Sequence, residues 1–208
     1  FAAKIGREIN GQSEIFDYIK QVNVIANFNH GAIIKTYGYC LKDFFGDDKN
    51  VMIMEYLKNG DLNDIIEAER EGNIKEGWDY TQKMIVLYGI ASGMAYIASY
   101  GVIHSDLKPQ NILMTENLLP KITDFDTARL ISENKAQSFN ISGFEISTPL
   151  YTPPESIGDN EYVEKSDVYS YSMILYQVLT LLEPFPHTSR FDLYDKVVEG
   201  ERPPIPDN

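Results

Sequence analysis

The spacing of apolar residues predicts one helix and a small sheet in the first quarter of the chain. Residues 13–27 carry apolar side chains at intervals of three and four, which is the period of a helix with one buried face. Residues 33–37 and 51–54 have the composition of strands. The polar residues 43–50 between them include Gly-Asp-Asp and suit the turn of a hairpin.

The pattern becomes mainly helical after Gly60. Residues 62–70 predict a short helix and residues 79–100 predict a long one. The inner face of the long helix is expected to consist of Met84, Leu87, Ala91, Met94 and Ala95. Residues 168–182 are almost free of charge but shorter than the roughly 20 residues of a membrane span, so we interpret them as a buried helix that residues 166–167 cap. A final helix is predicted over residues 191–199.

One long stretch follows neither the helical nor the strand period. Residues 132–147 are polar and rich in Ser and Asn, so they are predicted to form a loop. Loops of this length inside compact domains are usually functional. Taken together, the elements predict an α+β fold in which a small strand-bearing part precedes a larger helical part, with the junction near residues 55–60.

The net charge of the chain argues against one class of function, nucleic-acid binding. The 208 residues include 18 Lys and Arg against 31 Asp and Glu, a formal net charge of −13. A protein that holds a nucleic-acid backbone usually carries a basic surface, so we expect no nucleic-acid partner. This acidity still permits a local pocket for one small phosphate ligand, which needs only one or two lysines and a metal ion.

The single cysteine and the first residues indicate the cellular compartment of the protein. Cys40 has no second cysteine with which to form an internal disulfide, which is typical of a reducing compartment. Residues 1–5 lack the basic and then apolar pattern of a secretory signal. We therefore expect a cytoplasmic protein with no membrane span, and we leave its oligomeric state open.

Two motifs carry the chemistry. Residues 104–111 read HSDLKPQN, and residues 124–126 read DFD. At these motifs the sequence resembles the eukaryotic protein kinases, whose catalytic loop reads H-R-D-x-x-x-x-N and whose metal motif reads D-F-G. Six such matches at fixed spacing would arise by chance in fewer than about one in a million windows. The resemblance implies a bilobal fold, ATP and Mg²⁺ as cofactors, and a protein hydroxyl as phosphate acceptor.

Phosphoryl transfer gives each motif residue a physical role. It needs an oriented nucleophile, a cation on the phosphates and positive charge near the moving group. Asp106 would orient the substrate hydroxyl and accept its proton, and Lys108 would steady the phosphoryl group. Asn111 and Asp124 would offer oxygen ligands to Mg²⁺. The structural alternatives are a turn-capping aspartate at position 106 and a turn asparagine at position 111.

The resemblance extends to an ATP site. Residues 1–4 read FAAK and are similar to the V-A-I-K motif, which would place Lys4 at the α- and β-phosphates and Ala2 against adenine. Residues 51–62 resemble the hinge between the two kinase lobes, with Met54 as gatekeeper. The complete set implied for ATP is Ala2, Lys4, Met54, Glu55, Leu57, Asp61 and Leu113. The alternative interpretation of the hinge is an ordinary strand end and helix cap.

Further landmarks indicate the type of kinase. Residues 152–155 resemble the A-P-E motif, which would make residues 124–155 the activation segment. Lys108 and Thr148 resemble the serine/threonine pattern, so a Ser or Thr acceptor is expected. Residues 202–206 are similar to a stretch of the tyrosine-kinase-like branch of serine/threonine kinases.

Several positions depart from the family pattern. Gln21 stands where a glutamate usually pairs with the strand lysine, Asp126 replaces the glycine of D-F-G, and Ser105 replaces an arginine that receives a phosphate. An amide brings no charge to Lys4, so we expect Lys4 to be held less firmly. These departures motivate a rival hypothesis: a pseudokinase that acts as an ATP-binding or scaffold module. A metabolic kinase of small molecules is a third option.

The resemblance also predicts how the chain is organised. Residues 1–56 would form part of the N-terminal lobe, and residues 57–208 would form part of the C-terminal lobe. No glycine-rich loop occurs, so the sequence is expected to be truncated at both ends. Asp167 would brace the backbone of the catalytic loop, with a plain N-cap as its alternative role.

Overall fold

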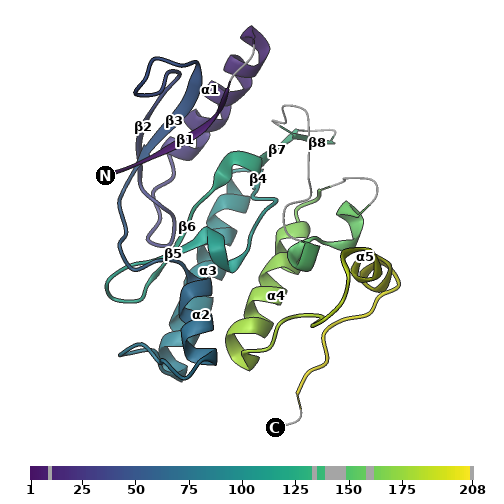
Figure 1. The fold of residues 1–208 in the computed structure, drawn as a ribbon. Coiled ribbons are helices and arrows are strands. Elements are labelled where there is room, and N and C mark those ends of the chain that lie inside the picture. The colour runs from purple at the N-terminus through teal and green to yellow at the C-terminus, as the bar shows by residue number, and fades with distance from the viewer. Residues whose placement is uncertain (9–10, 133–134, 139–148, 158–161, 207–208) are drawn as a thin grey trace.

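The computed structural model describes residues 1–8, 11–132, 135–138, 149–157 and 162–206. A small sheet with one helix lies at the N-terminal end, and a larger, mainly helical part follows (Figure 1). This is the α+β arrangement that the sequence predicts. The lobe boundary between residues 56 and 57 stays a prediction.

The N-terminal sheet has three antiparallel strands in the order β1-β3-β2. Their bounds are Ala2–Glu8 for β1, Thr36–Cys40 for β2 and Lys49–Met54 for β3. The central strand β3 pairs Met52 with Lys4 on one side. Helix α1 (Gln12–Ala26) lies beside β2, where the rings of Tyr18 and Tyr39 are 6.0 Å apart. The predicted first helix is confirmed.

Asp43 organises the turn between β2 and β3. Its carboxylate accepts hydrogen bonds from the backbone N–H groups of Phe45 at 2.8 Å and Asp47 at 3.0 Å. It also pairs with Lys49 at 3.2 Å. Because one side chain satisfies two backbone donors, the chain reverses tightly and the strands pair antiparallel. The hairpin predicted around residues 43–50 is confirmed.

The strand predicted over residues 33–37 is partly wrong. Strand β2 begins only at Thr36, and Ile33 and Ile34 lie before it. Both isoleucines are buried, and the N–H of Ile34 donates to the carbonyl oxygen of Ile122 at 2.9 Å. The sequence of two adjacent isoleucines does not indicate which strand they will pack against. Here it connects the N-terminal part to the C-terminal part instead of extending the N-terminal sheet.

Four helices form the body of the C-terminal part among the described residues. Their bounds are Leu62–Arg70 for α2, Tyr80–Ser99 for α3, Ser166–Thr180 for α4 and Arg190–Val198 for α5. Side-chain caps start three of them. Asp61, Asp79 and Ser189 accept hydrogen bonds from backbone N–H groups in the first turns of α2, α3 and α5. The sequence therefore located all four helices to within about two residues.

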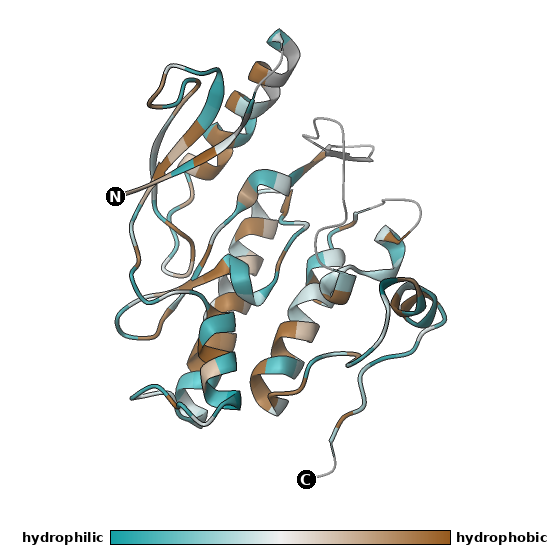
Figure 2. Cartoon of the chain, viewed as in Figure 1, coloured by the Kyte–Doolittle hydropathy of each residue, from teal (hydrophilic) through white to brown (hydrophobic). Residues whose placement is uncertain are grey.

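The predicted inner face of α3 is wrong in part. The buried residues of α3 are Val86, Leu87, Ile90, Gly93 and Ile97. Met84 is 42% exposed and Ala95 is also exposed. Hydrophobic residues occur on several sides of this helix (Figure 2), so their spacing did not identify the buried side. A Cβ at Gly93 would lie 2.7 Å from the Ile122 side chain, so α3 passes close to the junction between the two parts.

Short strands complete the C-terminal part. Their bounds are Val102–Ile103 for β4, Ile112–Met114 for β5, Pro120–Ile122 for β6, Arg129–Ser132 for β7 and Lys135–Ser138 for β8. Strand β5 pairs with β6, and β7 pairs with both β4 and β8. The prediction that residues 132–147 form only a loop is therefore wrong at its start, where Ser132 pairs with Lys135. Thr148 lies outside the described residues.

None of the helices in the described part of the chain combines the length and the apolar character needed to cross a membrane.

The packing of α3 supports a stability prediction. Ile90 is fully buried, whereas Tyr88 on the same helix is 76% exposed. Ile90→Ala should lower the free energy of unfolding by about 2–5 kcal/mol, because it removes buried apolar groups and leaves a cavity. Tyr88→Ala should change it by less than about 0.5 kcal/mol. Urea denaturation of both variants measures this, and equal losses would contradict the buried face described here.

Candidate active site

Asp106 lies in a cluster of three predicted catalytic residues. The Nζ atom of Lys108 is 2.7 Å from Oδ2 of Asp106. Asn111 donates through Nδ2 to the same carboxylate oxygen at 3.0 Å and to the backbone oxygen of Asp106 at 2.7 Å. The 3-10 turn η1 (Pro109–Asn111) directs the Asn111 amide back along the loop. The amide and the ammonium therefore fix the orientation of the Asp106 carboxylate.

Strand pairing brings the second motif to the first. Ile112 in β5 is paired with Ile122 in β6. The residues next to this pair therefore meet, and the N–H of Thr123 donates to the carbonyl oxygen of Asn111 at 3.0 Å. Asp124 follows immediately. The two motifs are thus neighbours because the first ends where β5 begins and the second begins just after β6 ends.

Asp167 holds the backbone of the catalytic loop. Its carboxylate accepts hydrogen bonds from the N–H groups of His104 at 2.7 Å and Ser105 at 3.0 Å. Ser105 adopts a positive φ of 68°, which turns both N–H groups toward the helix α4 that carries Asp167. Burial raises the pKa of the Asp167 carboxyl, and these two hydrogen bonds favour its ionised form. The side chain therefore braces the loop, whereas the N-cap of α4 is Lys165.

The side chain of His104 connects the catalytic loop to the DFD motif. Its ring is fully buried and accepts a long hydrogen bond at Nδ1 from the N–H of Asp106 at 3.4 Å. Its Nε2 therefore carries the proton and donates to the carbonyl oxygen of Thr123 at 2.9 Å. The ring centroids of His104 and Phe125 are 5.0 Å apart. One side chain thus contacts both segments that carry acidic groups.

Lys4 forms a second cluster with two acids. Its Nζ atom lies 2.6 Å from Oδ1 of Asp124 and 2.7 Å from Oδ2 of Asp126. Burial acts to lower the pKa of Lys4, but the charges of Asp126 and Asp124 outweigh it, so the net shift is upward. Lys4 is therefore a charged group in a partly buried setting. The cluster joins β1 to the DFD motif across 120 residues of sequence.

Gln21 contacts the same segment but not through Lys4. The Nε2 group of Gln21, on helix α1, donates a hydrogen bond to the backbone oxygen of Phe125. Gln21 is buried, as is Phe125. We predicted that an amide at position 21 would hold Lys4 only weakly. Instead, the carboxylates of Asp124 and Asp126 pair with Lys4, and Gln21 fixes helix α1 to the DFD backbone.

The backbone at the DFD motif explains how both acids reach one lysine. Asp124 adopts a left-handed conformation with φ 64° and ψ 66°. The chain then forms the 3-10 turn η2 (Phe125–Thr127), closed by the bond from the N–H of Ala128 to the carbonyl oxygen of Phe125 at 3.0 Å. Asp126 has no positive φ, so it needs no glycine-like freedom in this arrangement. The aspartate in place of glycine therefore causes no backbone strain at this position.

The residues predicted to face adenine line the junction of the two parts. Ala2 is paired with Met54 across β1 and β3. Ala2, Leu57 and Leu113 are partly buried and pack against the hydrophobic core, whereas Met54 is 7% exposed. These four side chains offer apolar surface of the kind a planar base requires. Their role in binding stays a prediction.

Glu55 and Asp61 are both engaged in the fold. The Glu55 carboxylate accepts from the N–H of Lys35 at 2.8 Å and pairs with Lys121 at 3.0 Å. Asp61 caps α2 by accepting from the N–H of Asp64 at 3.0 Å. The cap is the alternative that the sequence left open for this residue. The predicted contact of Asp61 with ribose would have to coexist with this cap.

The predicted metal ligands fit a magnesium ion. Mg²⁺ prefers oxygen and is usually held by one or two protein groups together with substrate phosphates. Because the Asn111 amide nitrogen bonds to Asp106, its carbonyl oxygen is the atom that would face a cation. Burial acts to raise the pKa of Asp124, but the charge of Lys4 outweighs it and keeps this carboxylate ionised. Nowhere in the described residues, this site included, do three His, Cys, Asp or Glu side chains form a group that could hold a metal ion by themselves.

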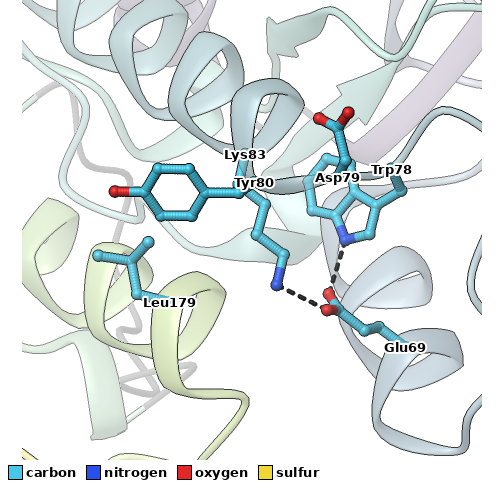
Figure 3. Close-up of a pocket in the computed structure, with 6 residues that line it drawn as sticks. All are labelled: Glu69, Trp78, Asp79, Tyr80, Lys83 and Leu179. Atoms are coloured by element: carbon cyan, nitrogen blue, oxygen red, sulfur yellow. Dashed lines mark hydrogen bonds and ion pairs between the residues drawn. The ribbon is translucent and has the colours of Figure 1, made fainter. Parts of the chain in front are cut away.

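A separate hollow lies between α2, α3 and α4 (Figure 3). It is lined by Glu69, Trp78, Asp79, Tyr80, Lys83 and Leu179. Glu69 accepts from the indole N–H of Trp78 at 2.7 Å and pairs with Lys83 at 2.6 Å. These groups satisfy one another and tie the loop between α2 and α3 to both helices. We interpret this hollow as structural.

Comparisons with known proteins identify the family of the chain. Residues 1–208 match the family described as protein tyrosine and serine/threonine kinase. The chain is 32% identical over 202 residues to the RGS domain-containing serine/threonine-protein kinase A of Dictyostelium discoideum, covering 97% of the chain and 17% of that protein. It is 30% identical over 192 residues to the BDNF/NT-3 growth factors receptor of Gallus gallus (88% and 23%). It is 32% identical over 193 residues to the Ephrin type-A receptor 5 of the same species (91% and 18%).

The chain therefore belongs to the protein tyrosine and serine/threonine kinase family. The resemblance drawn from the two motifs is confirmed, as is the α+β kinase fold. The chain spans less than a quarter of the length of the curated relatives named above. The activity, substrates and partners of the whole protein are accordingly matters for proposal.

The sequence did not assign a role to Asp126 at this site. Its position was noted only as a departure from glycine, yet its carboxylate is 2.7 Å from Lys4. The sequence did contain a sign of this role. Relative to the kinase pattern, a negative charge is missing at Gln21 and a negative charge is added at Asp126. Reading the two departures together would have pointed to Lys4.

The brace on the catalytic loop makes a stability prediction. Asp167→Ala removes the acceptor for two buried backbone N–H groups and should cost about 1–3 kcal/mol of folding free energy for each group left unpaired. Glu164→Gln, an exposed neighbour, should be close to neutral. Chemical denaturation of both variants measures the difference. Equal stability of the two would show that the loop does not depend on Asp167.

Proposed function

We propose that the protein is an active kinase that transfers the γ-phosphate of ATP to a serine or threonine hydroxyl of a protein. The observation that carries this proposal is the orientation of Asp106 by Lys108 and Asn111, next to Asp124. These contacts hold polar groups in the arrangement that phosphoryl transfer requires. Family membership supports the reaction class.

The chemistry follows from the placement of the residues. The Asp106 carboxylate orients the acceptor hydroxyl and takes up its proton as the new O–P bond forms, while the bond from the γ-phosphorus to the bridging oxygen of ATP breaks and ADP leaves. Lys108 supplies positive charge close to Asp106, where negative charge develops on the transferring group. Lys4 has three N–H donors and can direct one of them to a phosphate. Mg²⁺ held by Asn111 and Asp124 would supply charge neutralisation of the phosphates.

A second candidate function is an ATP-binding or scaffold module without transferase activity. The observation that favours it is the contact of Gln21 with Phe125, because helix α1 then brings no charge to Lys4. Against it, Asp106, Asn111, Asp124 and Lys4 are all present, Asp106 in contact with Asn111 and Asp124 in contact with Lys4. A module that transfers no phosphate has no need for an oriented proton acceptor.

The preference for serine and threonine rests on two points. Lys108 has the position that is typical of serine/threonine kinases, two residues after Asp106. The relative from Dictyostelium is named a serine/threonine kinase, whereas the family description covers tyrosine kinases too. Thr148, the other supporting residue, lies outside the described residues.

We also propose that the domain works in the cytoplasm. Cys40 is the single cysteine of the chain and is exposed, which suits a reducing compartment.

Transfer of labelled γ-phosphate from Mg·ATP to a generic basic protein tests the activity. Asp106→Asn should lower kcat by about 100-fold or more, because the amide cannot accept the proton. Glu116→Gln, in an exposed ion pair with Lys58, should leave kcat unchanged. Chelation of Mg²⁺ should abolish transfer. A folded protein that binds Mg·ATP but labels no substrate would favour the scaffold function.

A matched peptide set tests the acceptor. Three peptides that differ only in a central Ser, Thr or Tyr should be compared at equal concentration by kcat/KM. We expect Ser and Thr to exceed Tyr by at least about tenfold, because an aryl hydroxyl lies several ångströms farther from the peptide backbone. Preference for the Tyr peptide would overturn the proposed acceptor and leave the transferase assignment intact.

A further inference from the structure

We propose that Asp126 is the positioning carboxylate of Lys4 and replaces the glutamate that is missing at position 21 of helix α1. In this arrangement the charge stands on the DFD segment, and the neutral Gln21 fastens helix α1 to the same segment. The inference rests on the proposed function, in which Lys4 binds the ATP phosphates. It assigns Asp126 a task that the glycine of the D-F-G pattern cannot perform.

Two carboxylates contact Lys4, but only Asp126 would stay paired with Lys4 once Asp124 binds Mg²⁺. Asp124 is 2.6 Å from Nζ and Asp126 is 2.7 Å away, so both act as partners in this structure. Asp124 is also a predicted ligand of Mg²⁺, and a carboxylate that turns to the metal is weakened as a partner for lysine. Asp126 has no such second role. Lys4 would therefore remain paired with Asp126 when Mg·ATP is bound.

The contact of Gln21 disfavours a glutamate at position 21 as long as Asp126 holds Lys4. Its amide N–H donates to the carbonyl oxygen of Phe125, the residue just before Asp126. A glutamate at position 21 has no N–H to donate and would bring its negative charge close to that carbonyl oxygen. The amide at position 21 and the acid at position 126 are thus complementary. One supplies a donor to the backbone, and the other supplies the charge.

The surroundings of Asp126 agree with this direction of its side chain. Burial raises the pKa of Tyr18 on helix α1 to about 12, and the negative charge of Asp126 adds to this effect. Asp126 is therefore near Tyr18 of α1 as well as paired with Lys4 of β1. Its carboxylate is 43% exposed, so the pair with Lys4 is partly solvated and should be worth less than a buried ion pair.

This placement has a consequence for control of the site. Where the anionic partner of the lysine stands on the helix, a displacement of that helix breaks the pair. Here the partner stands two residues after the metal motif's first aspartate, in a turn closed by Ala128. Lys4 should therefore keep its orientation even when helix α1 shifts, provided that the DFD turn is intact.

A double-mutant cycle tests whether Asp126 acts through Lys4. The four proteins are the unchanged protein, Asp126→Asn, Lys4→Met and the double variant. Their affinity for a fluorescent N-methylanthraniloyl ATP with Mg²⁺ is measured by titration, and their thermal melting is measured without nucleotide. Asp126→Asn should weaken the affinity about five- to tenfold when Lys4 is present and have no effect beside Lys4→Met. Asp126→Glu should recover most of the loss.

Equal weakening in both backgrounds would overturn the proposal, because Asp126 would then act on nucleotide or metal directly. No weakening in either background would overturn it as well. If none of the four proteins binds nucleotide, the proposed ATP site fails, and the melting cycle alone decides the ion pair. Additive changes in melting temperature would then refute the pair, and non-additive changes would support it. Should Asp126→Asn fail to fold, Asp126→Gly, the family residue, takes its place.

A charge transposition tests the exchange between positions 21 and 126. Asp126→Gly should lower nucleotide affinity as Asp126→Asn does. Adding Gln21→Glu to Asp126→Gly should restore it, because the carboxylate then returns to helix α1. Gln21→Glu alone should give no gain, since Lys4 already has its partner and the bond to Phe125 is lost. No restoration in the transposed protein would refute the exchange.

Discussion

The backbone of Ile122 is the junction on which the rest of the site depends. Its N–H donates to Ala32 at 2.7 Å, its carbonyl oxygen accepts from Ile34 at 2.9 Å, and it is paired with Ile112 in β5. The side chain is fully buried, with Gly93 of α3 beside it. One strand end is thus hydrogen-bonded to the N-terminal part and to β5, and its side chain packs beside the long helix α3. Because Thr123 and Asp124 follow at once, every acidic group of the DFD motif inherits its position from this junction.

Electrostatics then divides the site into two clusters of paired charges. Asp106 is paired with Lys108, and Lys4 is paired with Asp124 and Asp126. The chain has a formal net charge of −13, with 18 Lys and Arg against 31 Asp and Glu. Two of its lysines, Lys4 and Lys108, lie in these clusters. The partial burial of these side chains strengthens each pair relative to pairs in open solvent. The acidity of the chain and its capacity to hold a phosphate ligand are therefore compatible.

The departures from the family pattern have separate physical outcomes. Asp126 occupies a 3-10 turn without positive φ, so the loss of glycine causes no backbone strain there. Ser105 takes the positive φ of the catalytic loop, and Asp167 binds its N–H. Gln21 turns to the backbone of Phe125. Changes that look like losses one at a time are thus accommodated by contacts with neighbouring groups.

The sequence by itself determined the helices, the hairpin around residues 43–50 and the reactive motifs, because these depend on local periodicity, capping side chains and fixed spacing. It did not determine which side of α3 is buried, since apolar residues occur on several sides of that helix. It did not place Ile33 and Ile34 against β6, because the sequence of an apolar pair does not identify the strand it contacts. Nor could it join Asp126 to Lys4: the two are far apart in sequence, and only the tertiary structure brings their charges within 2.7 Å.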